Sequence, residues 1–329
     1  MVINELNQRK FKPILIMYTT IKKNQKIFGL VLSVFMLFVI SCSEDDPKPM
    51  KSDDKNLVEL AISDSRFTTL VAAVQRAGLV DALSANGPFT IFAPTNQAFI
   101  DAGITDVSAV EVDVLKDILM YHVVPSEVPS SAVSSGGVAS LEGAPFFVSI
   151  TVDGKVWING NAQVIETDLE ATNGVIHAID NVIMKPSMSI AGIATDYTQG
   201  ATPEFTQLVG ALSRADLVDA VNGGFNENLT VFAPTDAAFA QLYDDLDVAG
   251  FEEIPLETLK NVLMYHVVPA RAFSQDLRDG AELPTLLTNE TLTVNLVDLQ
   301  IEDANLNTDL LNIHATNGVI HVIDKVMLP

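Results

Sequence analysis

Cysteine and basic residues are what this chain of 329 residues has least of. Its one cysteine, Cys42, cannot form a disulfide within the chain, so the fold has to be stabilised by packing of the apolar residues, which make up 48% of the sequence. Lysine and arginine number 19 against 42 aspartates and glutamates, giving a net charge of −23. Such a surface repels phosphate backbones, and we therefore predict that the protein has no nucleic-acid partner.

Sequence patterns of common enzymes are absent as well. The chain contains no GxxxxGK, HExxH or GxSxG sequence, and beyond Cys42 it has no cysteine nucleophile. None of its five histidines belongs to a group with the spacing of a zinc site, which needs three or four convergent ligands. We predict a protein that is not an enzyme and has no cofactor. Some acidic residues could bind calcium weakly, although a solvated acidic face is favoured because no EF-hand loop is present: Asp244, Asp245, Asp247, Glu252 and Glu253.

The N-terminal 41 residues have the pattern of an export signal. Three lysines precede the apolar run Ile27–Ile40, which is short for a membrane span and suits the core of a signal peptide. The run leads into Val39-Ile40-Ser41-Cys42, which resembles the lipobox of bacterial lipoproteins. The resemblance implies cleavage before Cys42 and acylation of that residue, with several acyl chains giving stable anchoring. An ordinary signal peptide with an incidental cysteine is the alternative.

Residues 42–54 are predicted to form a disordered tether, because they are polar, contain two prolines and have little to bury. The acidic stretch Ser43–Asp46 resembles a surface-export signal of some two-membrane bacteria, with a plain solvated tether as the alternative. We therefore expect a lipid-anchored protein of the cell envelope, in the outer membrane and exposed at the surface. Residues 1–41 hold six basic residues and one acidic residue, so cleavage leaves a net charge of −28.

Three sequence blocks occur twice, in the same order. FTIFAPTNQAF, ILMYHVVP and ATNGVIHAIDNVIM return as LTVFAPTDAAF, VLMYHVVP and ATNGVIHVIDKVML. A period this long indicates two copies of a whole domain, which we place at residues 55–186 and 187–329. Almost no linker remains between the copies, and we predict a fixed arrangement of the two domains.

The first block predicts a strand that turns directly into a helix. Pro94 ends the strand and Thr95 suits the N-cap of the helix. Pro234 and Thr235 occupy the same places in the second copy, where Asp236 adds a carboxylate at the positive end of the helix. We assign this corner a structural role.

The second block combines a helix with a short strand. Leu115, Ile118, Leu119 and His122 have the spacing of one helix face, and the second copy repeats it. A partly buried imidazole at the end of that helix needs hydrogen-bond partners, which favours a structural role. The alternative is a recognition role for two tyrosine–histidine pairs: Tyr121, His122, Tyr265 and His266.

The third block predicts a hairpin followed by a buried strand. Asn173-Gly174 and Asn317-Gly318 indicate tight turns with φ > 0. The strand that follows is apolar on both faces, so His177 and His321 are interpreted as core histidines rather than ligands. Before it, the first copy shows a meander of strands at 146–152, 155–158 and 162–167. Helices fill the first half of each copy and strands the second, which predicts an α+β fold.

Together these blocks resemble the fasciclin-like (FAS1) domain. FAPTNQAF and FAPTDAAF are similar to its first signature, NGVIHAID and NGVIHVID to its second, and MYHVVP to its Tyr-His motif. The resemblance covers residues 55–329 and implies a wedge of β-strands packed with several α-helices. It also implies an extracellular or surface-anchored protein that acts in cell adhesion or matrix contact. The Tyr-His motif has been proposed as an integrin-recognition element in animal members, but an integrin is no obvious partner for a chain with a bacterial lipobox.

Two functions are carried forward from the sequence. The main hypothesis is a non-enzymatic, lipid-anchored protein that contacts a cell-surface or matrix protein or a glycan, and meets the membrane through the lipid on Cys42 alone. The alternative is a glycan- or small-ligand-binding accessory lipoprotein of a nutrient-uptake system, which an exposed aromatic platform would support. Trp157, the sole tryptophan, is instead predicted on a core strand. His314 occurs in the second copy alone and has no assigned role.

Overall fold

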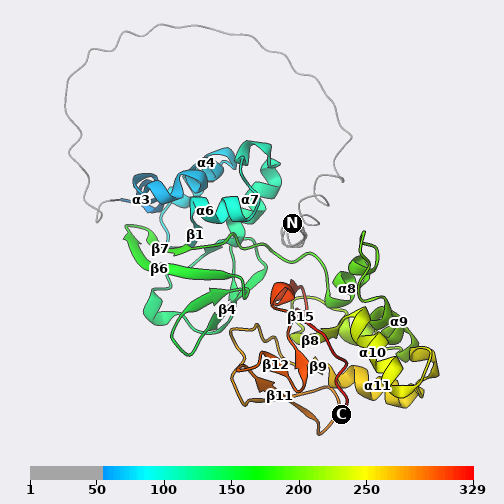
Figure 1. Ribbon diagram of the computed structural model, residues 1–329. Coiled ribbons are helices and arrows are strands. Elements are labelled where there is room, and N and C mark those ends of the chain that lie inside the picture. Colours follow the sequence, from blue (N-terminus) through cyan, green and yellow to red (C-terminus); the bar gives the residue numbers. More distant parts are fainter. Residues whose placement is uncertain (1–54) are drawn as a thin grey trace, which may run out of the picture.

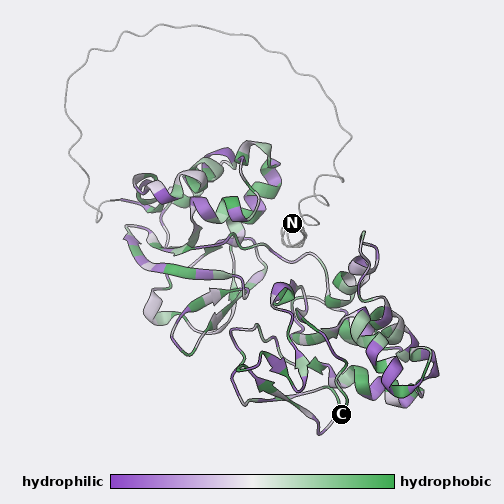
Figure 2. Ribbon diagram, in the orientation of Figure 1, coloured by the Kyte–Doolittle hydropathy of each residue, from purple (hydrophilic) through white to green (hydrophobic). Residues whose placement is uncertain are grey.

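The computed structural model describes residues 55–329, which form two similar domains (Figure 1). In both domains the helices gather on one side of the strands (Figure 1), and hydrophobic and hydrophilic residues mix along each helix (Figure 2). The predicted signal peptide, Cys42 and the predicted tether lie outside the described residues. Within residues 55–329, no helix is both long enough and apolar enough to cross a membrane.

The first domain opens with its helices. The helix α3 begins at a capping box, in which Asn56 accepts from the Glu59 backbone N–H and Glu59 accepts from that of Asn56. The helices of this domain are α3 (Leu57–Ser63), α4 (Thr68–Arg76), α5 (Val80–Ser84), α6 (Asn96–Asp101) and α7 (Val112–Tyr121), with 3-10 turns η2 (Ser65–Phe67), η3 (Val107–Ala109) and η4 (Ser130–Ala132).

One mixed sheet carries all strands of the first domain. Its order is β2-β1-β7-β6-β5-β4-β3, and only the β1–β7 pair is parallel. Every residue of β7 is buried, in agreement with the prediction of a buried strand. The strands are β1 (Phe89–Pro94), β2 (Val123–Val124), β3 (Gly136–Ala139), β4 (Pro145–Ile150), β5 (Val156–Ile158), β6 (Ala162–Ala171) and β7 (Gly174–Ile179). The predicted α+β class and the meander β4–β5–β6 are confirmed, whereas the sequence pattern did not predict β3.

The second domain repeats this plan with one interruption. Its helices are α8 (Ile190–Thr198), α9 (Thr206–Ala215), α10 (Asp236–Leu246) and α11 (Leu256–Tyr265), with η5 (Asp219–Val221), η6 (Phe251–Glu253) and η7 (Thr308–Leu310). Its strands are β8 (Leu229–Pro234), β9 (Val267–Val268), β10 (Glu282–Pro284), β11 (Thr291–Asn295), β12 (Gln300–Ile301), β13 (Ala304–Asn305), β14 (Ile313–Ala315) and β15 (Gly318–Ile323). The turn η7 divides the strand that is continuous as β6, so two sheets result: β14-β15-β8-β9 and β10-β11-β12-β13.

Each domain has its own hydrophobic core. One cluster lies between helices and sheet and a second lies among the strands, and within residues 55–329 no cluster mixes the two domains. Large, fully buried side chains anchor them: Phe67, Leu115 and Phe146 in the first domain, Phe205, Phe232 and Phe239 in the second. Trp157 is half-buried on β5 and belongs to neither cluster of its domain, so its prediction as a core residue was wrong. The two domains therefore touch through residues on their surfaces and share no hydrophobic core.

The Asn-Gly turn is built differently from the prediction. Ala171 pairs with Gly174, so the central residues of the hairpin are Thr172 and Asn173, and neither has a positive φ. The Asn173 side chain instead accepts from the Leu57 backbone N–H at 2.9 Å and donates to the carbonyl oxygens of two residues at the end of α5, at 2.9 and 2.8 Å. The asparagine thus ties the hairpin to the helices, and Gly174 alone takes the positive φ, of 150°.

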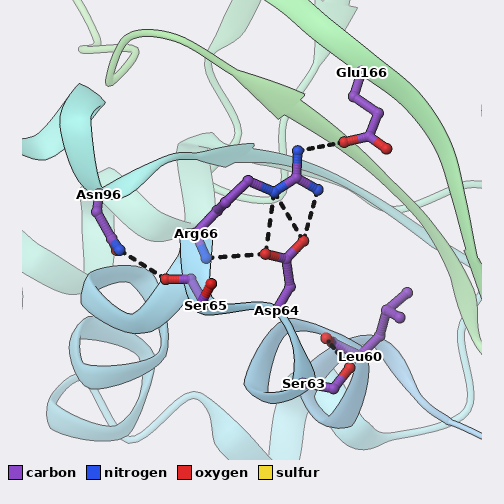
Figure 3. A network of polar contacts seen from close by, with 7 residues as sticks. All are labelled: Leu60, Ser63, Asp64, Ser65, Arg66, Asn96 and Glu166. Atoms are coloured by element: carbon purple, nitrogen blue, oxygen red, sulfur yellow. Dashed lines mark hydrogen bonds and ion pairs between the residues drawn. The ribbon is translucent and has the colours of Figure 1, made fainter.

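A polar network on the surface of the first domain joins η2 to β6 (Figure 3). The Arg66 guanidinium lies 2.6 Å from the Asp64 carboxylate and 2.5 Å from that of Glu166. Its hydrogen bond lowers the pKa of Asp64. Because the Arg66 and Glu166 side chains are 44% and 41% exposed, such pairs contribute at most about 1 kcal/mol, and we assign the network no further role.

Candidate functional site

The strand-to-helix corner holds the first helices of each domain together. Thr95 Oγ1 accepts from the Ala98 backbone N–H at 3.3 Å and caps α6, as Thr235 caps α10 through Ala238 at 3.1 Å. Pro94 and Pro234 are the last residues of their strands. The corner is occupied by backbone contacts and offers no group for chemistry.

The residue after each capping threonine reaches across to a second helix. Asn96 donates to the Ser65 carbonyl oxygen at 2.9 Å (Figure 3) and accepts from the Thr69 backbone N–H at 2.9 Å, at the start of α4. Asp236 accepts from the Gln207 backbone N–H at 2.9 Å, at the start of α9. The carboxylate expected to serve its own helix therefore also satisfies the first turn of another.

The two histidines that end α7 and α11 are buried and fully bonded. His122, 1% exposed, has Nδ1 2.7 Å from the Ile118 carbonyl oxygen, and its Nε2 accepts from the Ile183 backbone N–H at 3.0 Å. His266 makes the two equivalent bonds at 2.7 and 3.0 Å. A ring that donates from one nitrogen and accepts at the other is neutral. Burial lowers the pKa of each histidine to about 4.

The tyrosines beside them are buried as well. Tyr121 donates to the Pro145 carbonyl oxygen at 3.0 Å and accepts from Asn159 Nδ2 at 3.2 Å, and burial raises its pKa. Tyr265 donates to the Thr291 carbonyl oxygen at 3.1 Å. These side chains join the helices to β4 and β11. A partner cannot contact them without opening the domain, so the alternative recognition role has no exposed surface here.

The histidines of the third block fasten a loop that we call the strap, residues 125–130 in the first domain and 269–274 in the second. His177 Nδ1 accepts from the Asp168 backbone N–H at 3.2 Å, and Nε2 lies 2.8 Å from the Val128 carbonyl oxygen. His321 repeats this with Asn312 at 3.4 Å and Ala272 at 2.9 Å. Both rings are engaged by backbone, which leaves no nitrogen for a ligand.

Two small apolar cavities lie beneath the helices, at equivalent places. Their volumes are about 30 and 20 Å³, and Leu57 and Ile190, the first residues of α3 and α8, line them. A space of this size holds about one water molecule and is far too small for a sugar. Within residues 55–329, no group of three or more histidine, cysteine or acidic side chains could hold a metal ion.

The most extensive arrangement of polar and aromatic side chains lies between the two domains. The Arg271 guanidinium stacks over the ring of Phe147, with 4.1 Å from Cζ to the ring centroid. His314 packs edge-on against Phe147 and Phe273, at 5.9 and 5.4 Å between ring centroids. Phe147 is on β4 of the first domain and the other three residues come from the second. A cation over an aromatic face is attracted by the ring quadrupole, and more strongly when both are partly desolvated.

Hydrogen bonds surround this aromatic centre. The carbonyl oxygen of Gly160 accepts from Asn312 Nδ2 at 2.8 Å and from Gln275 Nε2 at 3.1 Å. Further out, Ser149 Oγ donates to Asp276 at 2.9 Å, and Arg278 donates to a carbonyl oxygen of β4 at 2.9 Å. Aromatic packing at the centre with hydrogen bonds around it is the usual plan of a specific interface.

Gly160 lies directly against side chains of the second domain. A Cβ atom there would lie 2.5 Å from Phe273 Cδ1 and 2.8 Å from Asn312 Cγ. The residue also has a φ of 64°, which favours glycine. The contact therefore depends on glycine for two independent reasons.

Charges in the contact are perturbed by burial. Burial lowers the pKa of Arg271 to about 10, so that it stays protonated at neutral pH. Its guanidinium is satisfied by carbonyl oxygens, including those of Gly318 at 2.8 Å and Thr316 at 3.0 Å. Burial, and then the charge of Arg271, lowers the pKa of His314 well below its ordinary value, and neither ring nitrogen has a hydrogen-bond partner.

Sequence reasoning did not find this contact. Its residues lie where the two copies differ: Glu127 stands at the place of Arg271, and Glu170 at that of His314. The one feature of the sequence that could have pointed to the contact is that His314 occurs in the second copy alone. Nothing in the sequence shows that it faces the other domain.

Comparison with known proteins shows which family this chain belongs to. A sequence profile described as the Fasciclin domain matches residues 65–185 and 203–329. The chain belongs to the fasciclin family. The family relationship agrees with the order of blocks and with the α+β fold of both domains.

Relatives occur in bacteria and in animals. Protein sll1483 of Synechocystis sp. is 50% identical over 134 residues, covering 40% of this chain and 73% of its own length. The transforming growth factor-beta-induced protein ig-h3 of Sus scrofa is 30% identical over 242 residues, covering 73% of this chain and 33% of its own. This chain thus spans about a third of ig-h3. A solved FAS1 domain pair from the insect cell adhesion molecule Fasciclin I is 19% identical with a TM-score of 0.36, covering 80% of this chain and 97% of that one.

Proposed function

We propose that this fasciclin protein is a non-enzymatic adhesion protein of the cell envelope, anchored by lipid on Cys42, that presents its two domains as one unit to a surface or matrix partner. The observation that carries the proposal is the contact around Phe147 and Arg271. It gives the exposed faces of the two domains a set spacing, so that both can engage one extended partner at once. Simultaneous engagement raises avidity without any strong individual site.

Three observations support adhesion over the binding of a small ligand. Fasciclin domains occur in adhesion and matrix proteins such as ig-h3, periostin and stabilin-2, to which this chain is similar. The two cavities beneath the helices are water-sized. The histidines and tyrosines shared by both copies are bonded inside the domains.

A binding screen tests the proposed function. The chain without residues 1–41 is immobilised and offered glycans, matrix polymers and cell-surface extracts, with and without calcium. Adhesion predicts attachment that falls steeply when either domain is deleted, because both domains contribute to avidity. Saturable binding of one free sugar by one domain alone would favour the nutrient-uptake alternative and contradict the proposal.

Replacing Gly160 with alanine should release the domains from each other. The added Cβ would overlap Phe273 and Asn312, which lie 2.5 and 2.8 Å from its position. Small-angle scattering should then show a larger radius of gyration and a flexible pair.

Gly154→Ala is the matched control for this substitution. Gly154 has a φ of 79°, and nothing lies within 4 Å of its Cβ position. It therefore carries the same kind of backbone strain, about 1–2 kcal/mol, without the contact. Identical scattering from the two variants, or free domain motion in the unaltered chain, would contradict a fixed arrangement.

Removing the thiol of Cys42 should abolish the anchor. In cells, Cys42→Ala should incorporate no labelled fatty acid, since no other cysteine is available for acylation. Ser43→Ala, which keeps the thiol, should remain labelled. A Cys42→Ala protein that still incorporates the labelled fatty acid, or an unaltered protein that incorporates none, would rule out the lipid anchor.

A further inference from the structure

The contact between the domains joins two different faces, and both faces occur a second time in the chain. The first domain contributes what we call the edge face, formed by residues 147–150 of β4 and the β5–β6 turn at 159–161. The second domain contributes the strap face, formed by its strap and residues 312–314. An arrangement of this head-to-tail kind leaves one strap face and one edge face free, and can in principle repeat from molecule to molecule.

The free strap face of the first domain has the backbone of the occupied one. Ser130 N donates to Asp168 Oδ1 at 2.8 Å where Ser274 N donates to Asn312 Oδ1 at 2.7 Å. Asp168 and Asn312 have φ values of 60° and 57°. The strap in both domains is fixed by the same histidine and threonine bonds.

Its side chains differ at four central positions of the contact. The occupied face has Arg271, Phe273, Asn312 and His314. The free face has Glu127, Pro129, Asp168 and Glu170 at the equivalent positions, three of which are acidic. Glu127 and Glu170 are exposed. The cation that stacks on Phe147 is thus replaced by an anion on the same framework.

The free edge face of the second domain also has acidic residues where the first domain has residues of the contact. Thr293 N donates to Glu302 Oε1 at 2.5 Å where Phe147 N donates to Asn159 Oδ1 at 2.8 Å, which makes Thr293 the equivalent of Phe147. Exposed Glu282 pairs with Thr293 across the β10–β11 ladder, where the first domain has Gly137 beside Phe147. The turn at Glu302 and Asp303 is one residue shorter than the turn that contains Gly160. Lys325 pairs with Asp303 and offsets part of this acidity.

We propose that the acidic residues on the two free faces stop the head-to-tail contact after one pair, so that the chain forms a closed two-domain unit and does not assemble with second copies of itself. A second copy would have to bring Glu127, Asp168 and Glu170 against Glu282, Glu302 and Asp303. Like charges in these positions oppose association. The free edge face also has Thr293 in place of the Phe147 ring and a shorter, acidic turn in place of the turn with Gly160.

Sedimentation of three two-domain chains that comprise residues 42–329 tests this. The unaltered chain should remain monomeric at low salt. In a second chain, both free faces carry residues of the occupied faces, and this chain should form complexes of two or more molecules. Its substitutions are Glu127→Arg, Pro129→Phe, Asp168→Asn, Glu170→His, Glu282→Gly and Thr293→Phe, with Asn-Gly-Asn in place of Glu302 and Asp303. The control has Asn-Ala-Asn in that turn and should return to the monomer, because the added Cβ repeats the overlap found at Gly160.

Should the fully converted chain fail to fold, two half-converted chains replace it, one with the strap-face substitutions and one with the edge-face changes. Mixed together, they should form a one-to-one complex that neither forms with the unaltered chain. A folded converted chain, or a mixture of folded half-converted chains, that stays monomeric overturns the proposal. Self-association of the unaltered chain through these two faces overturns it as well.

Discussion

Gly174→Ala should destabilise the first domain by about 4 kcal/mol or more, a size reserved for overlap or strain in the core. A Cβ at this position would lie 1.9 Å from the carbonyl oxygen of Phe89, at the start of the parallel β1–β7 pair. That pair lies inside the seven-stranded sheet, and the Phe89 backbone N–H also donates to the Asn173 carbonyl oxygen at 3.1 Å. The chain cannot make room without separating two central strands.

Urea unfolding followed by tryptophan fluorescence measures this effect in one domain. Trp157 is the sole tryptophan and lies in the first domain, so its signal reports on that domain. Gly143→Ala is the control, since Gly143 has a φ of 105° with nothing within 4 Å of its Cβ position. It should lose about 1–2 kcal/mol, through backbone strain alone. Equal losses of unfolding free energy for the two variants would show that overlap with the Phe89 carbonyl oxygen adds nothing to the effect.

The second domain offers the reciprocal experiment. A Cβ at Gly318 would lie 2.2 Å from the Leu229 carbonyl oxygen and 2.7 Å from Ile190 Cδ1. Gly318→Ala should therefore lower the unfolding midpoint seen by circular dichroism while leaving the Trp157 transition in place. A shift of both transitions would mean that the domains unfold as one unit.

Acid should destabilise the second domain as the pH falls from 6.5 toward 4. Burial lowers the pKa of His266 and His321 to about 4 in the second domain, and that of His122 to about 4 in the first. Burial also lowers the pKa of His314 well below its ordinary value. As the pH falls below 6.5, these histidines become protonated in the unfolded chain but stay neutral in the folded one. Their contribution to the free energy of unfolding is therefore fully present above pH 6.5 and is lost progressively toward pH 4.

The size of the loss follows from these pKa values. A histidine shifted from 6.5 to about 4 accounts for roughly 3 kcal/mol over the whole window, or about 1.4 kcal/mol per pH unit. His266 and His321 both act on the second domain, so their effects add there. Asp276 and Asp180 oppose the trend, because burial raises their pKa and their protonation favours the folded state, but each domain holds one of them.

Urea unfolding at several values between pH 4 and 6.5 tests this slope. The free energy of unfolding of the second domain, followed by circular dichroism, should fall by about 3 kcal/mol per pH unit, the sum for His266 and His321. His321→Gln removes one titrating group and should flatten the slope of the second domain. An unchanged slope in that variant would contradict the assignment.

Local sequence patterns predicted much of the fold. The capping threonines Thr95 and Thr235, the buried strand at 174–179 and the alternation of helices and strands follow from dihedral preferences and periodicity, which act over a few residues. The Asn-Gly pair shows where this reasoning fails. It predicted a positive φ at the turn, whereas Asn173 serves as a bridge to Leu57 and Leu83, far away along the chain.

The sequence by itself determined that there are two copies of a fasciclin domain, because a long internal repeat and ordered signature blocks need no coordinates. It also established the excess of acidic residues and predicted a lipid anchor at Cys42. The tertiary structure decided that Tyr121, His122, Tyr265 and His266 are internal, and that Phe147, Gly160, Arg271 and His314 meet across two domains. Burial and contact between distant residues depend on how the whole chain packs, and the contact residues belong to no motif that a local pattern could mark.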